Sequence, residues 1–166
     1  MNRPLPFDPI ARAAELWEDR IGPAGTMAAV TGVMRVQQII QSAVDGALKP
    51  HGLTFARYEA LVLLTFSRNA RLPMRVMGER LQLHPTSVTN IVDRLERDGL
   101  VKRVPHPTDR RTTLVEITEA GRALRVTATA SVTGIDFGLT GLTERQVEQL
   151  TDLLTKVRKS AGDFTG

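Results

Sequence analysis

Residues 85–118 read PTSVTNIVDRLERDGLVKRVPHPTDRRTTLVEIT, and this stretch decides the fold. In its first part, apolar side chains recur with the i, i+3, i+4, i+7 spacing of one helix face, at Val88, Ile91, Val92 and Leu95. Pro85 suits the first turn of that helix, and Gly99 can adopt the left-handed conformation that ends it. The spacing predicts a helix over residues 85–98 that packs one face and leaves a polar face free.

The second part of the stretch has the composition of β-strands. Residues 100–104 and 112–117 are rich in β-branched residues, and apolar and polar positions alternate in the latter. Residues 105–111 between them are rich in turn formers and end in two arginines. We therefore expect a β-hairpin with a protruding tip, which is a wing.

Two further helices are expected before this stretch. Pro73 suits a first helical position, and residues 73–81 have the pattern of a short helix that a turn joins to the next one. Residues 54–67 are apolar nearly all round, which is typical of a buried helix. Two short helices and a hairpin are the arrangement of a winged helix-turn-helix, whose second helix enters the DNA major groove.

Long amphipathic helices flank this unit. Apolar stripes run over residues 33–48 and over residues 147–157, and Thr143 with Gln146 forms a capping box before the second stripe. Thr118 is a cap for another helix that follows it. The expected fold class is mainly α with a small β-hairpin wing. The stripes fit a dimer interface and an intramolecular core equally well, because amphipathicity does not name the partner.

Composition excludes several classes of protein. At 166 residues, with 42% apolar and 24% charged residues, the chain is ordinary for one globular domain. No apolar run approaches the roughly 20 residues of a membrane span, and residues 1–8 lack signal-peptide features, so we expect a cytoplasmic protein without membrane contact. With no cysteine and three scattered histidines, no metal site and no thiol chemistry are expected. Hydrolase, phosphate-loop and metalloprotease motifs are absent, so we expect neither an enzyme nor a cofactor.

Positive charge is concentrated around the deciding stretch. The net charge is +4, but residues 68–111 alone hold ten Lys or Arg against five Asp or Glu. Such a block is the electrostatic footprint of a nucleic-acid contact, although a solvated surface would have the same composition.

Three motifs in fixed order resemble the MarR family of bacterial transcription regulators. They are LERDGLV at residues 95–101, DRR at residues 109–111 and LVEITEAG at residues 114–121. The resemblance covers roughly residues 51–161. It implies a homodimer that binds double-stranded DNA, with two recognition helices on a pseudo-palindromic operator.

The resemblance also implies a division of labour within one domain, residues 1–166. Residues 8–50 and 119–166 are expected to supply dimerisation helices, and residues 54–118 the winged helix-turn-helix.

The start and outer face of the helix over residues 85–98 are carried over as the DNA-reading surface. Its candidates lie near a helix N-terminus, where backbone N–H groups also favour phosphate: Pro85, Thr86, Ser87, Thr89 and Asn90. Asn90 can form two hydrogen bonds with adenine. As alternatives, Thr86 or Ser87 only caps the helix, and Thr89 is half-buried beside the apolar face.

In the wing, Asp109 and Arg111 match the family's Asp-x-Arg pair, which implies that the acid holds the arginine for entry into the minor groove. A narrow minor groove attracts arginine, and a carboxylate partner limits its rotamers. The alternative is a plain surface salt bridge. Nearby basic residues are expected beside phosphates or in solvent: Arg94, Lys102, Arg103 and Arg110.

The resemblance further implies an effector site between the dimerisation and DNA-binding parts, with candidates Trp17, Arg57, Tyr58 and Glu59. The helix with Trp17 resembles the extra N-terminal helix of the urate-responsive subgroup, whose tryptophan stacks on the ligand, and Glu59 falls where that subgroup has an acid. That subgroup's recognition-helix arginine aligns here with Ile91, which leaves another aromatic or carboxylate ligand open. The alternative role of Trp17 is an aromatic anchor for its helix.

The expected function is therefore a sequence-specific regulator, a repressor that a small aromatic or carboxylate ligand releases from its operator. The alternative is a ligand-independent architectural DNA-binding protein. The sequence names neither the ligand nor the operator.

Overall fold

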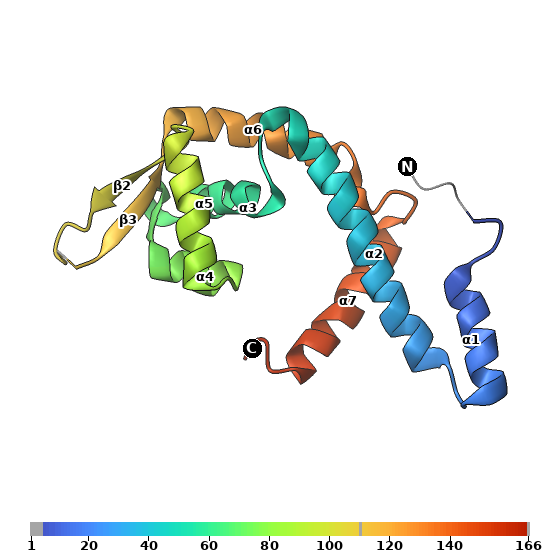
Figure 1. Ribbon diagram of the computed structural model, residues 1–166. Coiled ribbons are helices and arrows are strands. Elements are labelled where there is room, and N and C mark those ends of the chain that lie inside the picture. Colours follow the sequence, from blue (N-terminus) through green and yellow to red (C-terminus); the bar gives the residue numbers. More distant parts are fainter. Residues whose placement is uncertain (1–4, 110, 166) are drawn as a thin grey trace.

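The computed structural model describes residues 5–109 and 111–165, and its long helices extend away from a smaller winged unit (Figure 1). The helices are α1 Pro9–Arg20, α2 Gly25–Leu48, α3 Phe55–Phe66, α4 Met74–Leu81, α5 Pro85–Arg97, α6 Glu119–Thr133 and α7 Glu144–Ser160. The strands are β1 Arg71–Pro73, β2 Val101–Pro105 and β3 Thr113–Ile117. Short 3-10 turns are η1 Lys49–His51, η2 Arg68–Ala70 and η3 Asp136–Gly138.

The winged unit, residues 54–118, consists of α3, α4, α5 and an antiparallel sheet with strand order β1-β3-β2. Its helices and sheet share one apolar core, whose most deeply buried side chains include Leu61, Leu64, Met77, Val92, Leu95 and Val115. On the sheet, Glu116 of β3 lies 2.9 Å from Lys102 of β2 and 3.9 Å from Arg71 of β1. The predicted fold class is confirmed: helices dominate, and a small sheet forms the wing.

Strand β1 corrects one expectation. The sequence predicts that Pro73 opens the helix before the turn, but Pro73 is the last residue of β1, with an extended ψ of 141°, and α4 begins at Met74. The φ that proline imposes is compatible with both conformations, and three residues are too few to show an alternating pattern. The two-stranded hairpin therefore becomes a three-stranded sheet.

Helix α5 has the predicted face and ends but a different cap. The Nδ1 of His84 accepts a hydrogen bond from the Thr86 backbone N–H at 3.3 Å, so His84 is the N-cap. The alternative in which Thr86 or Ser87 caps the helix is wrong, and both hydroxyl side chains are exposed instead. Gly99, at φ 71°, ends the helix in the left-handed conformation, as predicted.

Gly121 lies where α5, β2 and α6 meet. A Cβ atom at Gly121 would stand 2.1 Å from the Leu100 carbonyl oxygen and 2.8 Å from Cγ1 of Ile117. The Thr118 Oγ1 accepts from the Gly121 N–H at 3.1 Å and donates to the Gly99 carbonyl at 2.8 Å. The start of α6 therefore rests on the backbone that follows α5.

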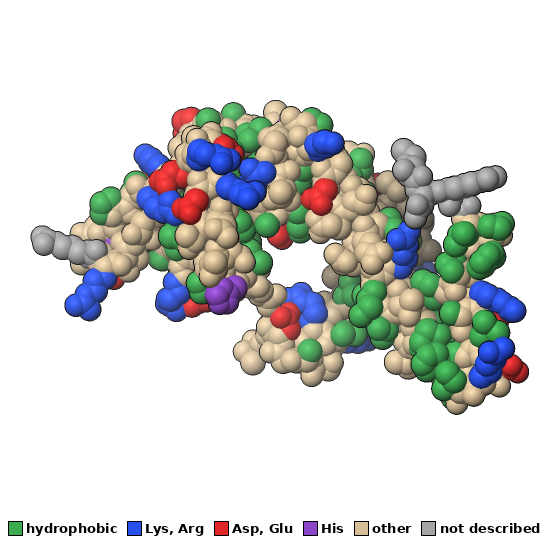
Figure 2. All heavy atoms as spheres, viewed as in Figure 1, with side chains coloured by type: hydrophobic (Ala, Val, Ile, Leu, Met, Phe, Trp, Pro, Cys, Tyr) green, Lys and Arg blue, Asp and Glu red, His purple; other side chains and the backbone are tan. Residues whose placement is uncertain are grey.

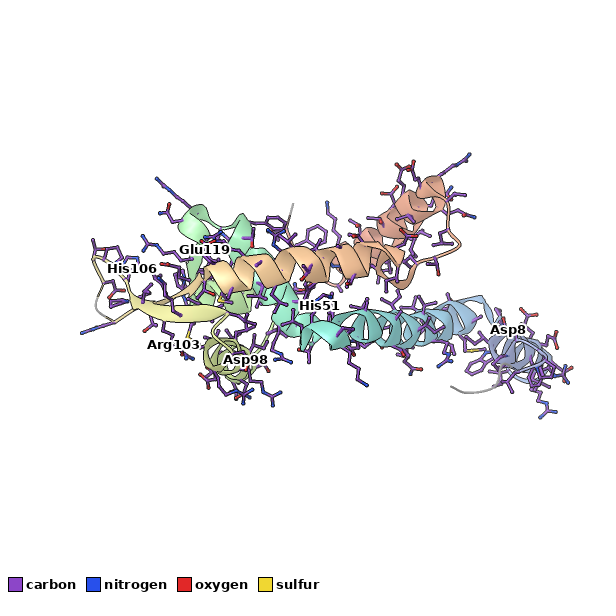
Figure 3. All side chains as sticks on the ribbon, turned by 90° about the horizontal axis from the view of Figure 1, so that it is seen from above. Asp8, His51, Asp98, Arg103, His106 and Glu119 are labelled. Atoms are coloured by element: carbon purple, nitrogen blue, oxygen red, sulfur yellow. The ribbon has the colours of Figure 1, made fainter. Side chains whose placement is uncertain are left out.

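Helices α2 and α6 run side by side away from the winged unit, and α1 packs on the far end of α2 (Figure 3). Helix α2 begins at Gly25, about two turns before the predicted stripe. Residues 25–32 contain no charge that would reveal an amphipathic face, which is why the stripe shows only from residue 33. Within the described ranges, no helix combines the length and the apolar character that crossing a membrane requires.

Helices α1 and α7 bury none of their residues within the chain. Exposed large apolar side chains gather on α1, α2 and α7, at Leu16, Trp17, Val30, Val33, Met34, Val36, Ile39, Leu153, Leu154 and Val157. Figure 2 shows such side chains over α1 and the neighbouring part of α2, at the end opposite the wing. Apolar surface of this extent is typical of a protein–protein contact.

Candidate nucleic-acid interface

The outer face of α5 presents the predicted polar side chains to solvent. Thr86, Ser87, Thr89 and Asn90 are all exposed, whereas Val88 and Val92 between them are buried. The alternative of a half-buried Thr89 is wrong, although its hydroxyl donates to the Pro85 carbonyl at 3.1 Å. Pro85 itself is exposed at the start of the helix. One helix thus anchors itself with one face and offers hydrogen-bonding groups with the other.

A shallow cavity of about 360 Å³ follows this face toward α3. Its polar lining includes Arg57, Ser87, Asn90 and Arg94. The Arg94 guanidinium together with the N-terminal turn of α5 favours a phosphate or another anion, whereas Arg57 already faces the Asp98 carboxylate.

Carboxylates of the positively charged segment, residues 68–111, form ion pairs within the winged unit. The guanidinium of Arg103 on β2 contacts the carboxylates of Asp93 and Glu96 on α5, and the Arg103 backbone N–H donates to Glu96 at 2.8 Å. Arg103 therefore holds strand β2 of the wing against α5. The sequence predicts Arg103 beside a DNA phosphate or in solvent, and it does not predict these ion pairs. Lys102, on the same strand, pairs with Glu116.

Two predicted contact residues keep free cationic groups. In the described ranges, neither Arg94 on α5 nor Arg111 in the wing has a carboxylate within ion-pair distance. Figure 2 shows Lys and Arg side chains spread over the α5 and wing end of the molecule. Arg110, also predicted to contact DNA, lies outside the described residues.

The wing tip is organised around Asp109. Its carboxylate accepts hydrogen bonds from the Thr112 hydroxyl at 2.6 Å and the Arg111 backbone N–H at 3.0 Å. The Thr112 and Arg111 hydrogen bonds hold the pKa of Asp109 below its usual range, so the carboxylate stays charged at neutral pH. The expectation that Asp109 holds the Arg111 side chain needs correction, because it holds the backbone and leaves the guanidinium free. His106, labelled at this end in Figure 3, accepts from the Asp109 N–H at 3.1 Å.

The predicted effector residues on α3 have unequal surroundings. Arg57 bridges α3 to the end of α5, with its guanidinium 3.3 Å from the Asp98 carboxylate and its side chain 13% exposed. Tyr58 is buried, and its hydroxyl lies 3.2 Å from the Thr129 hydroxyl of α6, so Tyr58 is a core residue. Glu59 is half-buried, and burial raises its pKa.

Trp17 does not join these residues within one chain. It is 37% exposed on α1. Helix α1 lies at one end of α2, and α3 follows the other end (Figure 1). The labelled Asp8, the N-cap of α1, and His51, just before α3, stand at opposite ends of α2 in Figure 3.

A larger cavity between α2 and α3, about 680 Å³, contains residues that the sequence did not single out. Lys49, Asp45 and Phe55 line it together with Arg57. Gly52, at φ 66°, turns the chain between the two helices and so creates this space. No periodic pattern marks these residues, because they come together only through the turn. In the described ranges, no cluster of acidic or histidine side chains could hold a metal ion.

Comparison with known proteins gives consistent matches. The model of the MarR family matches residues 51–112. The HTH-type transcriptional regulator MhqR of Bacillus subtilis is 31% identical over 131 residues, which are 78% of this chain and 89% of MhqR.

Solved structures extend the similarity to the whole fold. Sco5413, a MarR family transcriptional regulator from Streptomyces coelicolor, is 50% identical with a TM-score of 0.77, covering 85% of this chain and 98% of its own. CouR from Rhodococcus jostii RHA1, solved bound to p-coumaroyl-CoA, is 32% identical with a TM-score of 0.68, covering 81% and 92%. A mutant of MarR from Escherichia coli, complexed with operator DNA, is 28% identical with a TM-score of 0.69, covering 86% and 97%.

Proposed function

The chain belongs to the MarR family of transcriptional regulators, and from this premise we propose that it binds a pseudo-palindromic DNA operator as a homodimer. The observation that carries the proposal is the two-sided character of α5. Its buried side fixes the helix in the winged unit, and its exposed side offers Thr86, Ser87, Thr89 and Asn90. In a helix-turn-helix protein this side reads base edges in the major groove. The E. coli MarR mutant solved with operator DNA supports the same use of the fold.

The wing is proposed to supply the second DNA contact. With Asp109 engaged by the backbone and by Thr112, the tip has a defined shape, and the Arg111 guanidinium, unpaired among the described residues, extends from it. Arginine is the side chain that a narrow minor groove attracts most strongly. Arg94 is placed beside the α5 cavity for a phosphate contact.

The homodimer is proposed from surface that one chain leaves uncovered. Helices α1 and α7 bury no residue of their own, and the apolar side chains on α1, α2 and α7 lie on the same part of the molecule. A second copy presents the same apolar surface, so a two-fold interface can cover both at once. Residues 8–50 and 119–166 are therefore proposed as the dimerisation segments, beside the winged unit of residues 54–118.

We further propose that the protein is a cytoplasmic repressor that a small aromatic or carboxylate ligand releases from DNA. The cavity between α2 and α3 supports the ligand, because Lys49 offers a cation and Phe55 an aromatic ring beside the Arg57–Asp98 ion pair. CouR, a relative, was solved bound to p-coumaroyl-CoA, which carries an aromatic acyl group. Because Trp17 and Arg57 lie at different ends of α2, a site that uses both would be completed by the second subunit.

Arg111→Ala is expected to weaken operator binding about 30-fold or more, because the dimer loses two groove contacts and each contributes about 1–3 kcal/mol. The duplex is first selected from a random-sequence pool with the wild-type protein, and affinity is then measured by fluorescence anisotropy. Arg20→Ala, which removes the same charge from the exposed end of α1, is the control and should bind nearly normally. Unchanged affinity of Arg111→Ala would remove the wing from the DNA interface, whereas loss of its dimer would show that the residue has a structural role.

Trp17 is the only tryptophan, so its fluorescence reports one site without labelling. If Trp17 lines the effector site, aromatic acids that release the operator should quench its emission over the same concentration range. The coupling is reciprocal, so the DNA-loaded dimer must bind the same acid more weakly by the same factor.

Trp17→Phe keeps most of the packing area and should lower the affinity for the ligand more than it lowers the free energy of unfolding. Release with unchanged emission and a normal Trp17→Phe response would make Trp17 a packing anchor. If no aromatic or carboxylate compound releases DNA, the ligand-independent alternative holds.

A further inference from the structure

The last described residues return to the winged unit. Nε2 of Gln82, in the turn between α4 and α5, donates to Oδ1 of Asp163 at 2.6 Å. Oδ2 of the same carboxylate accepts from Nε of Arg158 on α7 at 2.7 Å. The Arg158 guanidinium in turn lies 5.3 Å from the centre of the Phe164 ring. One carboxylate therefore connects α7 to the turn that precedes the recognition helix.

Asp163 is held in this position by its backbone. Helix α7 ends in a Schellman motif, in which the Asp163 N–H donates to the Arg158 carbonyl and the Gly162 N–H to the Lys159 carbonyl, both at 3.1 Å. Gly162, at φ 74°, supplies the left-handed residue that this motif requires. The Asp163 side chain is 27% exposed, and its hydrogen bonds from Arg158 and Gln82 hold its pKa below the usual range. The carboxylate is therefore charged at neutral pH.

The other end of the link is fixed as well. Gln82 adopts the left-handed conformation, with φ 54° and ψ 42°, and its N–H donates to the Gly78 carbonyl. The Leu83 N–H donates to the same carbonyl at 3.0 Å, and His84 follows as the N-cap of α5. Gln82 and the start of the recognition helix consequently move together.

The link closes an arrangement that is otherwise open. Figure 1 places the chain end after α7 close to α4, and Figure 2 shows an opening between α7 and the helices above it, bounded below by the contact of the chain end with the winged unit. Helix α7 buries no residue, so its packing does not fix it to the winged unit. A charge-assisted hydrogen bond at its end does so instead.

We propose that Asp163 is a positioning residue that ties α7 to the turn before α5 and thereby sets the separation of the two recognition helices in the dimer. The inference rests on the proposed function, DNA binding by a homodimer. Two recognition helices must match half-sites about 34–36 Å apart, so a small rotation of each winged unit displaces both helices from the bases. A tie between the dimerisation helix and the recognition turn opposes that rotation.

The direction in which one substitution changes operator affinity distinguishes a positioning role of Asp163 from a purely electrostatic one. Asp163→Ala removes a negative charge, which alone should strengthen attraction to DNA. Loss of the tie acts in the opposite direction, and we expect operator affinity to fall about tenfold or more, as for the loss of a hydrogen bond to a charged group. Asp152→Ala removes the same charge from an exposed position on α7 and serves as the matched control.

The experiment compares the selected operator with duplexes in which the half-sites are one base pair closer or one base pair farther apart. Wild type and Asp152→Ala should lose affinity steeply with either change, and Asp163→Ala should discriminate much less between the three duplexes. Gln82→Ala should resemble Asp163→Ala in spacing preference, and the double variant should be no worse than Asp163→Ala alone, because Gln82 and Asp163 bond to each other. Hydrogen exchange of the Leu83 amide, measured without DNA, should be faster in Asp163→Ala than in wild type.

An Asp163→Ala protein with wild-type spacing preference, or with unchanged exchange at Leu83, would overturn the inference and leave DNA binding intact. If selection with the wild-type protein enriches no duplex, the proposed function is overturned, and the exchange measurement still decides whether the tie exists in solution.

Discussion

Operator binding should weaken by about a thousandfold or more when salt is raised from roughly 50 to 200 mM. Each subunit of the proposed dimer brings one α5 N-terminus and one wing, so about 6–10 phosphate contacts are expected in total. Every neutralised phosphate releases condensed counterions, and added salt opposes that release. The guanidinium group of Arg94, which pairs with no carboxylate of the described ranges, is the side chain best placed to make such a contact.

The measurement is the slope of log affinity against log salt concentration, by fluorescence anisotropy on the selected duplex. Arg94→Ala should make the slope shallower by about one for each phosphate that the variant fails to neutralise. Arg20→Ala should leave the slope unchanged. A flat salt response of the wild-type protein would contradict DNA binding through this surface.

Val157→Asp should convert the dimer into a monomer and lower operator affinity by about 100-fold or more. Val157 is 66% exposed in one chain and lies in the apolar stripe of α7, so the dimer would have to bury two uncompensated carboxylates. A monomer holds only one half-site, and it loses the high effective concentration of the second recognition helix. Light scattering after size exclusion gives the mass, and anisotropy gives the affinity.

Thr155→Asp is the matched control for this substitution, because it introduces the same charge on a different side of the same helix. It should remain dimeric and bind the operator. Circular dichroism should show a folded Val157→Asp monomer, since the core of the winged unit contains no residue of α7. A Val157→Asp protein that stays dimeric would remove this part of α7 from the interface.

Local signals in the sequence predict much of the winged unit. The apolar spacing of α5, the left-handed Gly99 and the Thr118 cap each depend on a few neighbouring residues, and the structure confirms all three. Strand β1 is not predicted, because it is three residues long and pairs with β3, some 40 residues later in the chain. The His84 cap is not predicted either, because histidine is rarely the acceptor at a helix start.

The sequence does not predict those roles of site residues that depend on contacts between distant parts of the chain. From the sequence, Arg103 is predicted to contact phosphate. The structure shows that it forms ion pairs with Asp93 and Glu96 of α5 instead. Tyr58 looks like a pocket residue until its hydroxyl meets Thr129. The sequence does place Thr86, Ser87, Thr89 and Asn90 on the free side of α5, because the helical period alone decides that.

The close approach at Gly121 makes the joint between α5 and α6 mechanically stiff. At this joint the Leu100 carbonyl faces the α6 backbone with no side chain between them, so there is no rotamer whose rearrangement could absorb a displacement. A rotation of α6 about its start would therefore have to carry the end of α5 with it, because the two backbones are in direct contact. The far end of α6 lies tens of ångströms away along the long helices, and a small angular change there becomes a proportionate swing of α5.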